Sequence, residues 1–158
     1  MKKIVILILV LACGLSLFAC SNDAKPTRIG TSEFSIVLPE GYRSEDDDFD
    51  EDQIAYYYKD DNSIDFDVYQ WEKGDNYTLE SEANAFAADY GAVAEVVTVN
   101  GIKGMKYVSQ EEFEGDIFTV VNYMFEDEIY IVELSFWTTN TEEEYTAIGE
   151  ILNTLKKN

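Results

Sequence analysis

The chain has 158 residues, of which 32 are acidic and 11 are basic, and it contains two cysteines and no histidine. Its net charge of −21 excludes nucleic acid as a natural partner, because the phosphate backbone attracts basic surfaces. The lack of histidine removes the commonest general base, the usual catalytic triads and most zinc sites.

Residues 1–19 have the layout of a bacterial lipoprotein signal peptide. Lys2 and Lys3 precede an apolar run, and Leu17-Phe18-Ala19-Cys20 fits a lipobox apart from the bulky phenylalanine. The apolar run is shorter than the ~20 residues of a transmembrane helix. We therefore expect cleavage before Cys20 and a lipid on its thiol, which would fix the protein to a cell membrane, facing outside the cytoplasm.

Cleavage at Cys20 has consequences for charge and for redox chemistry. The mature chain would keep 139 residues with nine basic and 32 acidic side chains, a net charge of −23. Cys13 would leave with the signal peptide, so no disulfide is expected. The size predicts one domain, with residues 20–30 as the lipidated cysteine and a flexible tether, and residues 31–158 as the domain.

Three strands are predicted in the first half of the domain, where apolar and polar residues alternate. They cover residues 32–38, 54–58 and 64–71, and the last two form a hairpin across the turn-rich residues 59–63. Residues 45–52 are acidic apart from one phenylalanine. Like charges at that density repel one another, so a solvated loop is expected there.

A helix is predicted next, because apolar residues change to helical spacing. Thr78 is a suitable N-cap, and Gly91 ends the pattern. The apolar stripe of this helix consists of Leu79, Ala83, Phe86, Ala87 and Tyr90.

Two further hairpins follow the helix. Residues 95–99 and 103–109 flank Asn100-Gly101, the strongest short turn signal in the chain. Residues 116–125 and 128–137 form long apolar strands rich in aromatic side chains. Such strands are typical of a sheet centre.

A C-terminal helix is predicted after Thr141, which can form a capping box with Glu144. Lys156 and Lys157 would suit the negative end of its dipole. The apolar stripe contains Tyr145, Ile148, Ile151, Leu152 and Leu155. The element order predicts an α+β fold, with an antiparallel sheet of about six to seven strands and helices packed on it.

Four segments resemble the PsbP-like family, whose bacterial members include small lipoproteins of the DcrB type. These segments are FSIVLPEGY (34–42), VNGIKGMKYV (99–108), VVNYMFEDEIYIVELSF (120–136) and the final helix. The resemblance covers nearly the whole domain. It concerns the order of the elements and the pattern of residues in the strands. It implies an α/β/α sandwich and noncatalytic roles in docking, assembly or chaperoning, and it transfers no site residue.

Carboxylates are the remaining candidates for catalysis. Asp65 and Asp67 lie on one face of a predicted strand, and paired carboxylates are the machinery of glycoside hydrolases. With 32 acids in the chain, a solvated hairpin edge is the simpler explanation of the pair. We expect no catalysis and keep a carboxylate-dependent hydrolase as the alternative.

Calcium is the one cofactor that the sequence suggests, and only as a weak ligand. Asp46, Asp48, Asp50 and Asp52 offer the oxygen atoms that this cation prefers. The segment lacks the glycine and the terminal glutamate of an EF-hand loop. A solvated acidic loop without metal is the simpler interpretation.

An aromatic binding face is a further hypothesis. Tyr57, Tyr69 and Trp71 would project from one side of the first hairpin, where they could stack on a sugar or anchor a protein partner. The alternative is that they pack under a helix.

These patterns together predict a membrane-anchored, extracytoplasmic lipoprotein that acts as a noncatalytic protein-binding or assembly module. Its expected partners are the membrane, through the lipid, and a protein. A carbohydrate- or Ca²⁺-binding module is the alternative function.

Overall fold

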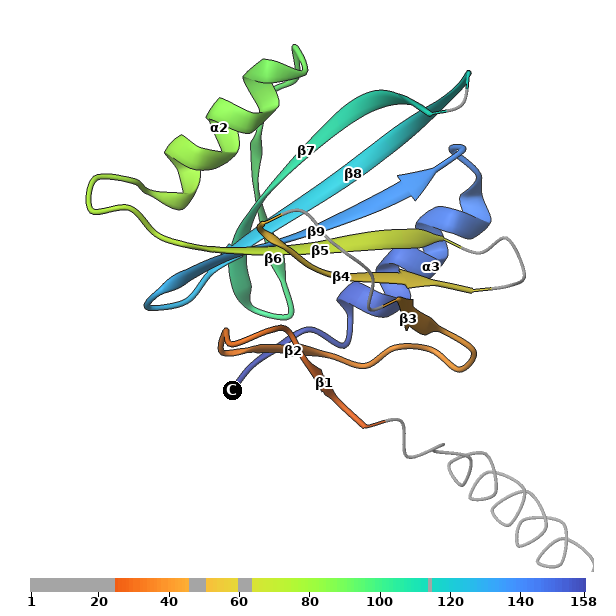
Figure 1. Cartoon of the computed structure of the whole chain (residues 1–158), viewed down its shortest axis with the longest axis horizontal. Coiled ribbons are helices and arrows are strands. Elements are labelled where there is room, and N and C mark those ends of the chain that lie inside the picture. The colour runs from red at the N-terminus through yellow and green to blue at the C-terminus, as the bar shows by residue number, and fades with distance from the viewer. Residues whose placement is uncertain (1–24, 46–50, 60–63, 114) are drawn as a thin grey trace, which may run out of the picture.

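A computed structural model describes residues 25–45, 51–59, 64–113 and 115–158. These residues form two antiparallel sheets and two helices (Figure 1). The large sheet consists, in order across the sheet, of β3 (Arg43–Glu45), β4 (Gln53–Tyr58), β5 (Asp65–Glu72), β9 (Tyr130–Thr138), β8 (Asp116–Glu126), β7 (Ile102–Phe113) and β6 (Glu95–Val99). The small sheet consists of β1 (Thr27–Arg28), β2 (Phe34–Ile36) and β10 (Lys156–Lys157), and the helices are α2 (Leu79–Asp89) and α3 (Glu142–Leu152).

This architecture confirms the predicted α+β fold with its antiparallel sheet. The three expected hairpins are β4–β5, β6–β7 and β8–β9, and β9 occupies the middle of the sheet with β8 beside it. Asn100 and Gly101 have φ angles of 49° and 80°. Positive φ at both central residues is what a two-residue hairpin turn requires.

Both helices begin where the capping residues predict. Thr78 accepts a hydrogen bond from the backbone of Ser81, and Thr141 accepts one from the backbone of Glu144. The Glu144 carboxylate in turn accepts hydrogen bonds from the backbone N–H groups of Thr141 and Thr139 and from the Thr138 hydroxyl. Partial burial acts to raise the pKa of Glu144, but these hydrogen bonds outweigh it and hold that pKa at about 2.

The folded part begins earlier than the pattern predicts, and its last residues form a strand. Residues 20–30 were expected to be a flexible tether, but Thr27 and Arg28 form β1, and Ile29 is buried in the core. Lys156 and Lys157 pair with β2 as a strand instead of ending the last helix. β2 lies within the predicted strand 32–38, but the two-residue strands β1 and β10 carry too little alternation to be seen in a sequence.

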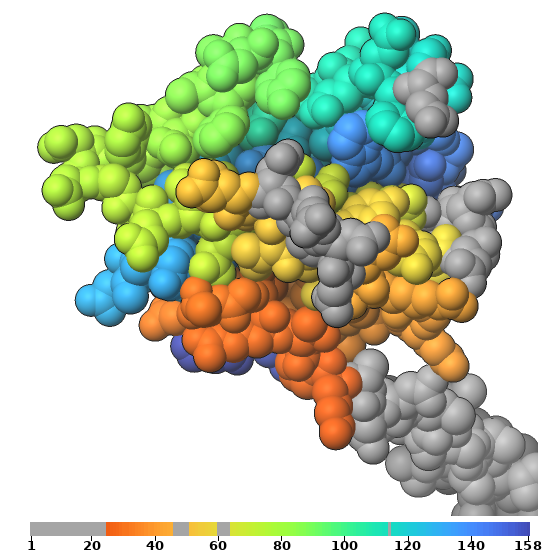
Figure 2. Space-filling model, in the orientation of Figure 1, coloured from red at the N-terminus to blue at the C-terminus, as the bar shows by residue number. Residues whose placement is uncertain are grey.

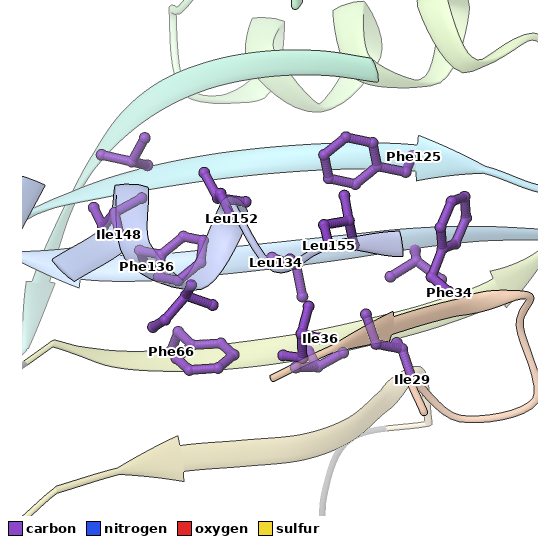
Figure 3. Packing of buried hydrophobic residues seen from close by; sticks show 14 of the residues in the cluster. Ile29, Phe34, Ile36, Phe66, Phe125, Leu134, Phe136, Ile148, Leu152 and Leu155 are labelled. Carbon is purple, nitrogen blue, oxygen red and sulfur yellow. The ribbon is translucent and has the colours of Figure 1, made fainter. Parts of the chain in front are cut away.

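One face of the large sheet carries the main core (Figure 3). Phe66 of β5 and Leu134 and Phe136 of β9 are fully buried there. Against them pack the apolar stripe of α3 and the side chains of β2. The buried residues of α3 and the segment after it are Ile148, Ile151, Leu152 and Leu155, and those of β2 are Phe34 and Ile36.

The opposite face of the large sheet, called the open face below, is covered by α2 at one end only. Leu79, Ala83 and Ala87 of the helix pack there, and they form a second, smaller core. Its strand residues are Met105, Tyr107, Met124 and Ile131. Figure 1 shows α2 beside β7, at one end of the sheet. Among the described residues, no helix is long and apolar enough to cross a membrane.

Candidate functional site

A pocket of about 550 Å³ lies on the open face, next to the part that α2 covers. In Figure 2, α2 and the tip of the β7–β8 hairpin rise on two sides of a hollow in the surface. Acidic and aromatic side chains dominate the lining, and we call it the acid–aromatic pocket. Its lining residues are Glu51, Asp52, Gln53, Asp67, Tyr69, Trp71, Glu82, Phe86, Tyr90, Tyr107, Glu111, Val120, Asn122, Glu133, Ser135 and Trp137.

Glu133 is the most deeply buried carboxylate of this pocket. It lies on the central strand β9 and is 5% exposed. The hydroxyl of Tyr107 donates a hydrogen bond of 2.6 Å to its Oε1 atom, and Ser135 is a second hydrogen-bond partner. Burial raises the pKa of Glu133 to about 7, because removal from water penalises the carboxylate ion. The hydrogen bonds from Tyr107 and Ser135 oppose this rise only in part, and the nearby Glu111 charge adds to it.

Asp67 is the second buried carboxylate, 7% exposed, on the neighbouring strand β5. Trp137 donates its indole N–H to Oδ2 at 2.6 Å, and Gln53 donates its amide to Oδ1 at 2.7 Å. Burial is the main reason that the pKa of Asp67 is raised, and the Asp65 charge adds to it, against the Trp137 hydrogen bond. Each oxygen of Asp67 is therefore fixed in place and keeps a lone pair for a further donor.

Glu111 of β7 is a third acid that lines the pocket. Burial, and then the charge of Asp67, raise the pKa of Glu111. Neither lysine nor arginine occurs among the described residues that line the pocket. The ion pairs found in the described part of the chain join Lys73 to Glu126, Lys106 to Glu95 and Lys157 to Glu33, all elsewhere. The buried carboxylates of the pocket thus have neutral hydrogen-bond donors but no cationic partner.

Aromatic rings form the walls. Trp71 and Phe86 meet at the α2 end with a centroid separation of 5.5 Å, and Tyr90 stacks on Tyr107 at 6.5 Å. Trp137 stands at the other end of the pocket. Although Phe86 and Tyr90 belong to the apolar stripe predicted from the sequence, they are 36% and 49% exposed, and they line the pocket instead of packing in the core.

The structure separates the three aromatic residues that the sequence placed on one face. Tyr69 and Trp71 line the pocket, but Tyr57 pairs with Phe66 in the register of β4 and β5 and packs on that ring in the main core. Residues directly opposite in an antiparallel pair share a face, so Tyr57 lies on the other side of the sheet. The expectation of a shared face is corrected for Tyr57 and holds for Tyr69 and Trp71.

The other predicted site residues lie in different places, and some of them lie outside the described residues. Asp65 and Asp67 do lie on one face, but Asp67 is buried instead of forming a solvated edge, and Asp65 accepts a hydrogen bond from Tyr56 at 3.0 Å. Of the acidic loop, Asp52 lines the pocket. Asp46, Asp48 and Asp50, and the lipobox with Cys20, lie outside the described residues. Within the described ranges, no three acidic side chains are close enough together to hold a metal ion.

Sequence reasoning missed Glu133, Tyr107 and Glu111. The signal for Glu133 was present, because it is the one charged residue in the apolar run Ile129–Trp137. A charge inside a central strand is rarely buried without a specific reason. Tyr107 and Glu111 gave no such signal, because each has other polar residues next to it in β7.

Comparisons with known proteins bear on the fold. No family model and no curated protein matches the sequence. Among solved structures, cyanobacterial PsbP (CyanoP) from Synechocystis sp. PCC 6803 matches with a TM-score of 0.62 and 11% identity, over 90% of this chain and 99% of that one.

A protein from Bacteroides thetaiotaomicron VPI-5482 matches with the same TM-score and 16% identity, over 85% of this chain. This chain spans 49% of the length of that protein. At such identities the likeness concerns the fold alone. The chain therefore has a PsbP-like α+β fold.

Proposed function

We propose that this protein is a membrane-tethered, noncatalytic binding module of the DcrB-type lipoprotein group, and that its acid–aromatic pocket holds a positively charged group of its ligand. The fold suits an accessory module in general. One observation carries the pocket assignment. The Glu133 carboxylate is 5% exposed in a concave, aromatic site, and no basic side chain among the described residues compensates it.

A cationic ligand would supply the missing partner. A buried ion is costly unless a counter-charge accompanies it, so an incoming ammonium or guanidinium group would be attracted by Glu133 and Asp67. The faces of Trp71 and Tyr69 are also favourable surfaces for a cation. The remaining acids around the rim, such as Glu82, would steer a positively charged ligand toward the pocket.

The two other ligand classes fit the pocket less well. A sugar needs donors as well as acceptors, but the amides of Gln53 and Asn122 already donate to Asp67 and to Ser109. A calcium ion needs six to eight oxygen atoms around one point. No group of three acidic side chains among the described residues meets that need.

A hydrolase would use the same carboxylates differently. It needs one acid that is free to give a proton to the substrate and a second group that attacks or activates water. In this pocket Asp67 accepts hydrogen bonds from two side chains, and Glu133 has hydrogen bonds with Tyr107 and Ser135. Carboxylates held in place by fixed donors, with lone pairs left for a further donor, suit recognition of a charge better than proton transfer, so we propose binding without turnover.

The binding proposal has a convenient test, because both tryptophans of the chain line the pocket. Intrinsic fluorescence of the full chain in detergent would be titrated with phenethylamine and, as a neutral match, with phenethyl alcohol. We expect saturable binding of the amine only, and at least a tenfold loss of affinity in Glu133→Gln.

Glu112→Gln is the matched control, because Glu112 is exposed, lies on the same strand as Glu111 and gives the same change in net charge. It should bind like the wild type. Equal binding of the alcohol and the amine would contradict the proposed chemistry. Release of sugar from glycan substrates, lost in Glu133→Gln, would favour the hydrolase instead.

The tether has a separate test. Cells that express the full chain would be labelled with a fatty-acid analogue, and membrane fractions would be compared between the wild type and Cys20→Ser. We expect the label and the membrane association to depend on Cys20. A labelled Cys20→Ser variant would show that the lipid is attached elsewhere.

A further inference from the structure

A second hollow continues the acid–aromatic pocket along the open face. It has a volume of about 390 Å³ and lies toward the tip of the β7–β8 hairpin. We call it the hairpin hollow, and its lining residues are Tyr56, Asp65, Asp67, Phe113, Phe118 and Trp137. Because Asp67 and Trp137 line both cavities, the two form one trough across the sheet.

The far end of this trough is apolar. Phe118 packs edge-on against Trp137 at a centroid separation of 6.0 Å, and Phe113 is 60% exposed beside them. Phe113 and Phe118 lie on the open face, whereas Ile117, which is 70% exposed, points to the other side of β8. An exposed ring next to a hollow lined by other rings is a typical place for an apolar side chain of a partner.

The length of the trough follows from the strand register. Asp67 shares a rung of the sheet with Asn122 and Tyr107. Phe118 lies four residues from Asn122 along β8, and Phe113 lies six residues from Tyr107 along β7. At about 3.3 Å per residue, the acidic centre and the apolar end are separated by about 13–20 Å. An extended peptide covers that distance with four to six residues.

We infer that the trough binds an extended peptide segment of a protein partner, with a lysine or arginine in the acid–aromatic pocket and an apolar residue four to six positions away in the hairpin hollow. This rests on the proposed function of the pocket and names its ligand. Charge complementarity supports it, because the lining contains acids and no basic residue in the described part of the chain. A small amine would fill only the first cavity and leave the second one empty.

The experiment uses six-residue peptides with blocked ends, titrated against the full chain in detergent by tryptophan fluorescence. One peptide has lysine first and leucine last with a glycine–serine spacer, a second has the reverse order, and a third has lysine first and serine last. We expect one of the two leucine peptides to bind at least tenfold more tightly than the serine peptide.

Two variants test whether the higher affinity of the leucine peptide comes from the hairpin hollow. Phe113→Ser should abolish the advantage of leucine over serine, and Ile117→Ser, a change of the same kind on the other face of the hairpin, should keep it. Equal binding of all three peptides, or an advantage that survives Phe113→Ser, would overturn the peptide inference.

The proposed function would fail in a different way. If phenethylamine and the serine peptide bind, and both are weakened by Glu133→Gln, then the pocket assignment stands whatever leucine contributes. If phenethylamine and all three peptides fail to bind the wild type, both the pocket assignment and the peptide inference are wrong.

Discussion

Glu133→Gln should gain stability relative to the wild type as the pH rises from 5 to 8. The folded state holds the pKa of Glu133 at about 7, against about 4.5 for an exposed glutamate. Below pH 4.5 the carboxyl is neutral in both states, and above pH 7 it is ionised in both. As the pH rises through this window, the folded state therefore loses stability relative to the unfolded one.

The size of the effect follows from the two pKa values. Between pH 5 and pH 8 the wild type should lose about 2.5 kcal/mol through this group, at 1.36 kcal/mol per pKa unit. Glutamine is close in shape, keeps an oxygen for the Tyr107 hydroxyl and does not titrate. The stability difference between Glu133→Gln and the wild type should therefore grow by about 2.5 kcal/mol over this range.

Urea unfolding of both proteins at pH 5 and pH 8, without ligand, measures this difference. Glu112→Gln serves as the control and should show no such growth. A Glu133→Gln variant that is equally destabilised at both pH values would refute the reasoning, because the carboxylate would then contribute to stability as a hydrogen-bond acceptor only. A variant that is more stable but binds the amine less well would identify Glu133 as a residue kept for binding at the expense of stability.

Three further predictions follow from the same structure. The affinity for phenethylamine, measured by fluorescence, should fall by up to about two orders of magnitude from pH 8 to pH 5, because Glu133 takes up a proton; a pH-independent affinity would exclude Glu133 as the counter-ion. Gly104→Ala should lower the unfolding free energy by about 1–3 kcal/mol in urea titrations, since a Cβ atom there would lie 2.7 Å from the Phe125 ring and from a backbone oxygen; unchanged stability would mean that β8 yields easily. Glu144→Ala should destabilise the protein by about 1 kcal/mol at pH 7, and this loss of stability should vanish as the pH falls toward 2. Glu143→Ala, a change in the same helical turn, should alter the melting temperature little.

The helices and hairpins were predictable because their signals are local. Thr78 and Thr141 satisfy backbone donors within one turn of their own position, and Asn100-Gly101 needs only its own φ angles. Alternation over eight or more residues likewise identifies β5, β8 and β9. The strand that contains β2 was predicted, but its pairing in the small sheet was not, because β10 joins β2 from the opposite end of the chain.

The site was only half predictable. Tyr69 and Trp71 were found as aromatic residues on one face of a strand, but the register of β4 decided that Tyr57 would lie on the other face. Glu111 lies on β7 and Glu133 lies on β9, and the whole of β8 separates the two strands in sequence. No spacing along the chain shows that they share a pocket with Asp67.

The sequence by itself determined the type of each main element, the antiparallel α+β class and the acidic charge, and it predicts lipid attachment at Cys20. Only the tertiary structure decided that α3 and the small sheet together cover one face of the large sheet while α2 covers an end of the other. The physical reason is that periodicity sets which side chains share a strand face, whereas strand order and helix docking depend on contacts between distant segments. The open face, and with it the buried Glu133, results from those contacts.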